Sequence, residues 1–280
     1  MKNTINTVAV VTGAGGTLCS EMAKSLAAMG IKVALIGRDL NKLKIVEEEI
    51  KNNGGIAISI STDVTDQTAV ELAEKQISAQ LGKVSILING AGGNQSEAIT
   101  TVNQFDPKEL ETPSPDFRGF FNLDMIRFLD VIKTNSMGSI IPSFVFGKVM
   151  AKNGGGSIIN IASMSSFRAL SRVAAYAFAK AGMVNFTQWL GAYLAPANIR
   201  VNAIAPGFFL NERSTKLLTT PEGGFTERGA SIINITPMKD FGKAPQLIGT
   251  MKYLLDNEAS GFVTGITISV DGGFLASAGI

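Results

Sequence analysis

Histidine is absent from the chain, and cysteine occurs once, at Cys19. The lack of histidine excludes a Ser-His-Asp triad, a histidine general base and most zinc sites, so we expect no metal site. Proton transfer must therefore use Tyr, Lys, Asp, Glu, Ser or water. A single cysteine cannot form an internal disulfide bond, which is typical of a cytoplasmic protein. We interpret Cys19 as a small packing residue.

Long apolar segments and runs of one charge sign are also missing. No apolar segment is long enough to cross a bilayer. The net charge is only +2 and no basic run occurs, which argues against nucleic acids and anionic membranes as partners. The first apolar run ends at Thr12-Gly13 without a small-residue cleavage site, so it predicts a buried strand rather than a signal peptide. We therefore expect a cytoplasmic protein with a small-molecule partner.

Short apolar runs alternate with longer segments of helical periodicity. Strands are expected at 8–11, 32–36, 56–61, 84–89, 157–161, 200–204 and 267–270. Helices are expected at 20–29, 41–52, 70–81, 136–152 and 174–194. This alternation predicts an α/β fold: one Rossmann-like, doubly wound parallel sheet with helices on both faces, spanning 1–280 as a single domain. The irregular, proline-containing stretch 94–118 predicts a functional loop.

A glycine-rich turn, Thr12-Gly13-Ala14-Gly15-Gly16, follows the first strand and precedes a helix. Such a turn lets the backbone approach a pyrophosphate at a helix N-terminus, although a tight turn without a ligand is the alternative. Gly37 ends the second strand and Arg38 follows, and a guanidinium there would pair with a 2′-phosphate. This favours NADP(H) slightly over NAD(H), against the adjacent Asp39. Asp63 would bind the adenine amino group or cap the next helix.

Tyr176 and Lys180 are four residues apart in an expected helix, which places both on one helix face. A nearby ammonium group would lower the pKa of the phenol towards neutral pH, as a general acid or base requires. Ser163 follows the expected strand 157–161, where its hydroxyl would hydrogen-bond a reacting oxygen. Each feature alone has a structural alternative, namely a Tyr/Lys packing pair or a turn serine.

Together these residues resemble the short-chain dehydrogenase/reductase family over nearly the whole chain. The motifs that carry the resemblance are Thr12-Gly13-Ala14-Gly15, Asp63-Val64, Asn89-Gly90-Ala91-Gly92, Asn135, Ser163, Tyr176-x-x-x-Lys180, Asn202-Ala203-Ile204-Ala205-Pro206-Gly207, Val263-Thr264-Gly265 and Val270-Asp271-Gly272-Gly273. The resemblance implies that Tyr176 is the acid/base and that Lys180 binds the nicotinamide ribose and lowers the tyrosine pKa. It further implies that Ser163 orients the substrate oxygen and that Asn135 holds a water in a proton relay.

The resemblance also implies a cofactor-binding set and an oligomer. The set is Gly13, Gly15, Gly16, Thr17, Leu18, Arg38, Asp63, Val64, Asn89, Ala91, Gly92, Tyr176, Lys180, Pro206, Gly207 and Phe209. The chain departs from the family pattern where Thr17 and Cys19 replace later glycines and where Asn211 replaces a threonine. Family members usually form tetramers, so we expect a homotetramer.

Within the family, the insertion at about 94–125 and the run Phe208-Phe209-Leu210-Asn211-Glu212-Arg213 resemble the D-mannonate oxidoreductase (fructuronate reductase) branch. That resemblance implies hydride transfer between a nicotinamide and a sugar-acid carbonyl or alcohol. A lid is expected at about 208–240. The candidate substrate-binding residues are Asn94, Gln95, Arg168 and Arg213, with Arg172 and Lys216 as further cations near the site. The alternatives are a reductase of another ketone, of 3-oxoacyl or polyol type, and a dinucleotide-binding relative without catalysis.

Overall fold

The computed structural model describes residues 7–111, 114 and 116–277, without the side chains of Glu212 and Arg213. Its centre is a parallel sheet of seven strands in the order β3-β2-β1-β4-β5-β6-β7. The strands are β1 (Val8–Thr12), β2 (Lys32–Gly37), β3 (Ala57–Ser61), β4 (Val84–Asn89), β5 (Gly156–Ile161), β6 (Ile199–Pro206) and β7 (Thr267–Val270). The strand order reverses direction between β1 and β4, which creates a crevice at the carboxyl ends of these strands. The expected Rossmann-like fold is confirmed.

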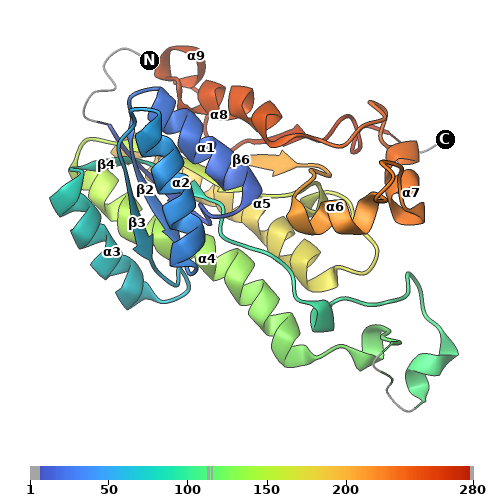
Figure 1. Cartoon of the computed structure of the whole chain (residues 1–280). Helices are drawn as coiled ribbons and strands as arrows, with labels where there is room; N and C mark the ends of the chain where they lie inside the picture. The colour runs from blue at the N-terminus through green and yellow to red at the C-terminus, as the bar shows by residue number, and fades with distance from the viewer. Residues whose placement is uncertain (1–6, 112–113, 115, 278–280) are drawn as a thin grey trace.

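Helices cover both faces of the sheet (Figure 1). The side chains of α1 (Thr17–Ala28), α2 (Leu40–Asn52) and α8 (Ile248–Leu255) pack in one apolar core. Those of α3 (Gln67–Gln80), α4 (Met125–Lys152) and α5 (Ala174–Leu194) pack in the other. The remaining helices are α6 (Glu212–Leu218), α7 (Glu227–Ile235) and α9 (Asn257–Ser260). No helix within the described parts of the chain is long and apolar enough to cross a membrane.

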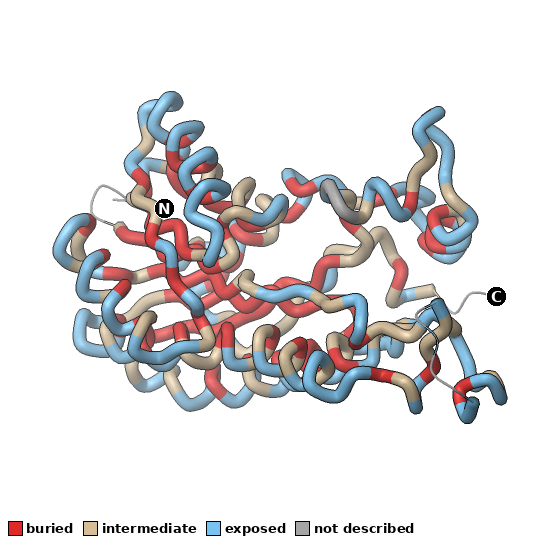
Figure 2. Tube along the Cα trace, turned by 60° about the horizontal axis from the view of Figure 1, so that its bottom comes forward, coloured by how far each residue is buried: buried red, intermediate tan, exposed pale blue. Residues whose placement is uncertain are grey.

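The continuous apolar character of the strands follows from this two-sided covering. In β1, Ala9 and Val11 belong to one core, whereas Val8 and Val10 belong to the other. Both sets are fully buried, and Figure 2 shows the sheet as the buried centre of the molecule. A strand covered on both faces has no solvent-facing positions, so its sequence lacks the apolar–polar alternation of a half-exposed strand.

Several helices begin earlier than their apolar periodicity predicts, and two of these differences bear on the site. The helix expected from Ser136 begins at Met125, because the Asp124 carboxylate accepts hydrogen bonds from the amides of Ile126 and Arg127 and caps the first turn. The helix expected from Ser20 begins at Thr17, with Gly16 as its N-cap. The second difference brings the helix N-terminus directly to the end of the glycine-rich turn.

Two irregular segments extend from the carboxyl ends of the strands (Figure 1). In its described residues, the first follows β4 and contains short 3₁₀ turns at Ser96–Ala98, Pro107–Leu110 and Phe120–Asn122 and an isolated bridge between Ser114 and Phe117, before α4 begins. The second follows β6 and contains α6 and α7, which pack on each other through Leu218, Ile232 and Ile233, with Phe241 in the same apolar cluster. Both segments lie at the end of the sheet where ligands bind in doubly wound folds.

Candidate active site

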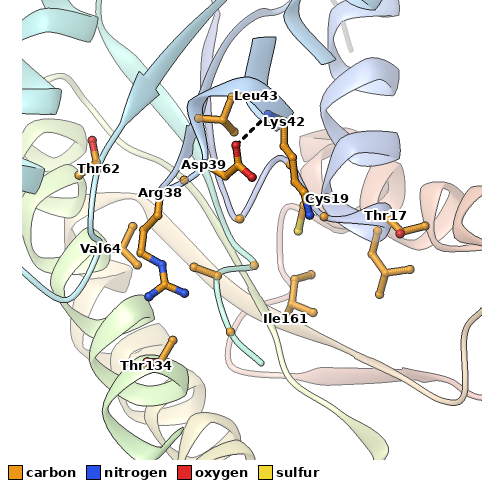
Figure 3. A pocket seen from close by; sticks show the side chains of 18 of the residues that line it. Thr17, Cys19, Arg38, Asp39, Lys42, Leu43, Thr62, Val64, Thr134 and Ile161 are labelled. Atoms are coloured by element: carbon orange, nitrogen blue, oxygen red, sulfur yellow. Dashed lines mark hydrogen bonds between the residues drawn. The ribbon is translucent and has the colours of Figure 1, made fainter. Parts of the chain in front are cut away.

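A cavity of about 630 Å³ opens at the carboxyl ends of the central strands (Figure 3). Its walls are the glycine-rich turn, the β2–α2 turn, the loop after β3 and the loop after β4. The predicted residues that line it are Gly13, Gly15, Gly16, Thr17, Leu18, Arg38, Asp63, Val64, Ala91 and Gly92. The structure therefore brings together ten predicted cofactor residues from four separate segments.

The glycine-rich turn and the loop after β4 fit tightly against each other. Gly13 has φ +67°, and a Cβ there would lie 2.8 Å from the Gly90 carbonyl oxygen. The Thr12 hydroxyl accepts hydrogen bonds from the amides of Gly90 and Ala91, at 3.1 and 3.2 Å. A Cβ on Gly90 would lie 2.0 Å from Cys19 Sγ. Glycine at these positions is required by close backbone approach, and Cys19 fills the space behind it.

Charged side chains surround the far end of the cavity. Figure 3 shows the Arg38 guanidinium reaching across the cavity towards Thr134. The neighbouring Asp39 carboxylate caps α2 by accepting from the amides of Asn41 and Lys42. Asp63 accepts from the amide and hydroxyl of Thr65, and these bonds hold its pKa below the usual value. Asp66, not Asp63, caps α3, so Asp63 remains a cavity residue that stays ionised at neutral pH.

Ser163, Tyr176 and Lys180 converge beside this cavity. Ser163 follows β5 and is buried, and the amide of Ser165 donates to its hydroxyl at 3.2 Å. The Ser163 side chain lies close enough to the Tyr176 phenol to lower its pKa. The Lys180 ammonium lies 5.6 Å from the centre of the Tyr176 ring and donates to the Ile161 carbonyl oxygen at 2.7 Å. Because Ile161 also lines the cavity, this hydrogen bond holds the ammonium at the cavity wall.

The pKa of the phenol moves in the direction opposite to the expected one. Desolvation raises the pKa of Tyr176 above its usual value of 10.0, although part of the side chain is exposed, and the neighbouring Ser163 side chain offsets only some of that rise. Burial lowers the pKa of Lys180 from 10.5 to about 8. Desolvation disfavours the charged form of both groups, and the Lys180 ammonium does not produce the expected lowering of the phenol pKa.

Comparison with known proteins decides the family. A sequence profile described as short chain dehydrogenase matches residues 7–222. The chain belongs to the short-chain dehydrogenase family. It is 44% identical over 279 residues to the Bacillus subtilis (strain 168) protein named uncharacterized oxidoreductase UxuB, covering 100% of this chain and 98% of the relative. Membership makes it an NAD(P)-dependent oxidoreductase, so the prediction of an enzyme of this family is confirmed.

Two solved structures of short-chain dehydrogenases add a cofactor to the comparison. One, from Haemophilus influenza, is provisionally described as a D-mannonate oxidoreductase with bound NAD; it has a TM-score of 0.92 and 39% identity and covers 99% of this chain and 98% of its own. The other, from Beutenbergia cavernae, is provisionally described as an NAD(P) dependent gluconate 5-dehydrogenase with bound NADP at low occupancy. Its TM-score is 0.79 at 30% identity, covering 96% of this chain and 97% of its own.

The cavity of this short-chain dehydrogenase fits a dinucleotide. Its glycine-lined floor leaves the room that Cβ atoms would fill, and the N-terminus of α1 opens onto it. A bound nicotinamide dinucleotide supplies or accepts the hydride in this family. The fit is set by the backbone of the turns more than by side chains, which explains why the replacements at Thr17 and Cys19 leave the cavity open.

Several predicted residues of the short-chain dehydrogenase site have structural partners instead. Asn89 is buried, and its amide donates to Ser143 and to Asn160, whose own amide donates to Thr187. It does not line the cavity. The Asn135 amide donates to the carbonyls of Gly93 and Val131 and accepts from the Gly93 amide. Its side chain therefore clamps the loop after β4 and is fully engaged, so the predicted relay water would have to use the main chain of Asn135.

The turn after β6 is shaped by packing. A Cβ on Gly207 would lie 2.6 Å from Asp271 Cα, and the Gly207 amide donates to the Val270 carbonyl. Pro206 is the last residue of β6. The Phe209 ring is buried against Gly242 rather than placed on the cavity surface. Asn211 does line the cavity, as its expected replacement of the family threonine requires.

The predicted substrate residues are dispersed. Asn94 and Gln95 lie in the loop after β4, where the Asn94 side chain accepts from the Gln95 amide. Arg168 is exposed and donates to the Ser277 carbonyl, with its guanidinium 5.4 Å from the centre of the Phe274 ring. The C-terminal segment thus holds Arg168. The side chain of Arg213 lies outside the described residues.

Sequence reasoning missed several residues that line the cavity. Among them are Lys42, Leu43, Thr62, Thr65, Thr134 and Ile161. Figure 3 shows the Lys42 side chain running along the cavity from the first turn of α2. Its position three residues after Asp39, at the start of a helix that follows a strand tip, was the available signal. Thr134 had no such signal, because it was expected to precede the helix that in fact contains it.

Proposed function

We propose that this short-chain dehydrogenase transfers a hydride between a nicotinamide and a sugar-acid carbonyl or alcohol of the D-fructuronate/D-mannonate type. The observation that carries the substrate class is the full-length likeness to the Haemophilus protein described as a D-mannonate oxidoreductase. That likeness covers 99% of this chain and so includes the segment after β4 that departs from regular structure. The arrangement of Ser163, Tyr176 and Lys180 supports the chemistry.

In the proposed reduction, the Tyr176 phenol gives its proton to the substrate oxygen as the carbonyl carbon is reduced. The raised pKa of Tyr176 keeps the phenol protonated at neutral pH, which suits the acid role. The Ser163 hydroxyl lies beside the phenol and would hold the same substrate oxygen in place. The Lys180 ammonium, fixed by the Ile161 carbonyl, would bind the ribose of the cofactor and favour the tyrosinate left after proton transfer.

NADP(H) is proposed as the slightly preferred cofactor. Arg38 extends into the adenosine end of the cavity, so its guanidinium is available to a 2′-phosphate, whereas the Lys42 side chain ends beside Cys19 (Figure 3). The Asp39 carboxylate would oppose that phosphate, but two helix amides already hydrogen-bond it. The NAD bound by the Haemophilus protein supports the opposite preference.

The segments at about 94–125 and 208–240 are proposed as the substrate-side loop and the lid. Each segment begins after the carboxyl end of a strand that borders the cavity. The first also holds a smaller cavity of about 320 Å³ between Thr100 and Phe121. A substrate bound between these two segments would be shielded from water at its reacting carbonyl.

A homotetramer is proposed from the exposed apolar side chains of α4 and α5. Leu129 and Phe144 on α4 are 64% and 61% exposed, and Phe178, Trp189 and Tyr193 on α5 are 57–68% exposed. Trp189 and Tyr193 stack on each other at 5.0 Å between ring centres. Apolar surface of this extent on adjacent helices marks an association surface, which light scattering at several concentrations would test. The cytoplasmic location stays a prediction from the sequence.

The substrate test is an assay of purified enzyme with D-fructuronate and reduced nicotinamide, followed by nicotinamide absorbance. A neutral ketose, a cyclic ketone and a 3-oxoacyl thioester form the comparison panel. The proposal expects the highest kcat/KM with the sugar acid. Turnover of a panel ketone without turnover of any acidic sugar would contradict it.

A further inference from the structure

The first turn of α5 carries the phenol of Tyr176, and the residue at its start does not cap it. The N-cap is Val173, whose apolar side chain accepts no hydrogen bond from the first-turn amides. A helix end without such a cap needs other contacts to hold its first turn in place. Tyr176 is the third residue of the helix, so the position of its phenol depends on those contacts.

The segment after β4 supplies two hydrogen bonds at this point. Arg172 directly precedes the N-cap of α5, and its carbonyl accepts from the Thr100 amide at 3.1 Å. Its Nε donates to Asn103 Oδ1 at 2.8 Å. The backbone of Arg172 has φ +76°, a conformation that residues other than glycine rarely adopt and that clusters at functional sites. Both the main chain and the side chain of Arg172 therefore join α5 to this segment.

The same segment also packs against the tyrosine. Ala98 is fully buried and forms an apolar cluster with Val131 of α4 and Ala175 of α5. Tyr176 packs against this cluster. The side chain that carries the phenol thus rests on a surface built jointly by α4, α5 and the segment after β4.

The segment is itself anchored, so it can hold α5 in place. The Glu97 carbonyl accepts from the amide of Asp124, the N-cap of α4, at 3.3 Å. Within the segment, Arg118 Nη1 donates to the carbonyls of Ser96 and Ile99, at 2.6 and 3.2 Å. These bonds tie the part of the segment that contacts α5 to α4, which packs on the sheet.

We propose that Arg172 is a positioning residue for the reaction: by joining α5 to the segment after β4, it fixes the Tyr176 phenol relative to the reacting carbonyl. The inference rests on the proposed acid role of Tyr176 and deepens it, and it holds for any ketone that the enzyme reduces. Proton transfer requires the donor within hydrogen-bond reach of the substrate oxygen, and a displacement of about 1 Å can lower the rate up to a hundredfold.

The test removes the side-chain bond from either end. Arg172→Gly deletes the guanidinium but tolerates the positive φ, so the backbone bond to Thr100 can persist. Arg172→Gly and Asn103→Ala should each lower kcat by about tenfold, with KM and the dinucleotide Kd within about twofold. Because both lose the same bond, the double variant should lose no more than either single variant. Asn103→Asp restores the bond as a charge-assisted pair and should keep kcat near that of the parent.

A comparison of substrates separates positioning from direct binding. Each variant is assayed with D-fructuronate and with the neutral panel ketone that the parent reduces fastest. Positioning predicts the same loss of kcat with both. A rise in KM for the sugar acid alone would overturn the inference, because the Arg172 guanidinium would then bind the substrate carboxylate. As a control, Arg127→Gln removes a surface guanidinium that pairs with Asp130 and should change neither substrate. Unfolding midpoints show that each variant is folded.

Absorbance titration of the tyrosines gives a measurement that needs no substrate. The chain has three tyrosines, and subtraction of the Tyr176→Phe curve isolates Tyr176. Desolvation raises the pKa of Tyr176, so Asn103→Ala should lower that pKa towards 10.0 as water reaches a less firmly held phenol.

The outcomes distinguish this inference from the function beneath it. If the parent reduces a ketone and Asn103→Ala keeps its kcat, the positioning role is refuted and the proposed function stands. If the parent reduces no ketone, the proposed function fails, and the titration still decides the position of the phenol. A lowered pKa of Tyr176 in Asn103→Ala then supports the inference, and an unchanged curve refutes it.

Discussion

The contact between Cys19 and Gly90 gives a prediction whose size follows from the structure. A Cβ built on Gly90 lies 2.0 Å from Cys19 Sγ and 3.0 Å from the Thr12 carbonyl oxygen. Cys19 is 4% exposed and packs inside the larger core, so its sulfur has little room to move. We expect Gly90→Ala to lower the free energy of unfolding by about 2 kcal/mol, within the usual range for an overpacked core.

Removing the sulfur should make that methyl group acceptable. In Cys19→Ala the nearest side-chain atom to the new methyl is Cys19 Cβ, at an ordinary contact distance of 3.6 Å. Cys19→Ala alone should cost about 1 kcal/mol for the lost packing. The double variant should lose at most about 1 kcal/mol of stability relative to the parent, since the new methyl group then has one tight contact, with the Thr12 carbonyl oxygen. The expected coupling between the two sites is therefore about 2 kcal/mol in favour of the pair.

Urea unfolding of the parent, both single variants and the double variant measures this coupling. Dinucleotide titration of the same four proteins measures whether the cavity still binds the cofactor, because Gly90 and Cys19 both line it. The single Gly90→Ala variant should bind the cofactor more weakly than the double variant. Losses that simply add, within about 0.5 kcal/mol, would refute the steric argument.

Three further predictions concern the charged and catalytic groups. Arg38→Gln should weaken NADP(H) binding by about tenfold to a hundredfold and leave NAD(H) binding nearly unchanged, since one charge-assisted pair contributes about 1.5–3 kcal/mol; equal effects on both dinucleotides in a titration would argue against a 2′-phosphate contact. Tyr176→Phe should lower kcat by about 10²–10⁴ while dinucleotide affinity stays within a few-fold, measured by steady-state kinetics and titration; an active phenylalanine variant would remove the acid role. Because folding lowers the pKa of Lys180 from 10.5 to about 8, the unfolded chain binds more protons between these values, so the parent should gain up to roughly 3 kcal/mol of stability relative to Lys180→Met as pH rises from 8 to 10.5. A pH-independent difference in urea unfolding would show that Lys180 is not desolvated.

The sequence predicts the regular parts of this fold closely, for a physical reason. The bounds of β4, α5 and β7 agree with those expected, since buried strands and a long helix leave clear periodicity. The apolar periodicity does not predict the start of α4, because Ile126 and Leu129 in its first turns are apolar but exposed, and they obscure the helical pattern. Only the capping carboxylate of Asp124 signalled the true beginning.

Side-chain roles at the site were harder to predict than positions. The spacing of Tyr176 and Lys180 correctly indicates that they meet, but it carries no information about desolvation, which decides the direction of the phenol pKa. The motif position of Asn89 gives no hint that its amide turns into the sheet and away from the cavity.

The buried amides of Asn89 and Asn160 face each other across β4 and β5 and are also paired in the backbone register. Sliding either strand by one residue would point an amide into hydrocarbon on the wrong face and leave its donors unmatched. This hydrogen-bonded pair therefore fixes the register of β4 relative to β5. Because β4 leads to Ala91 and Gly92 and β5 leads to Ser163, the fixed register also fixes the position of the cavity wall relative to the Ser163 hydroxyl.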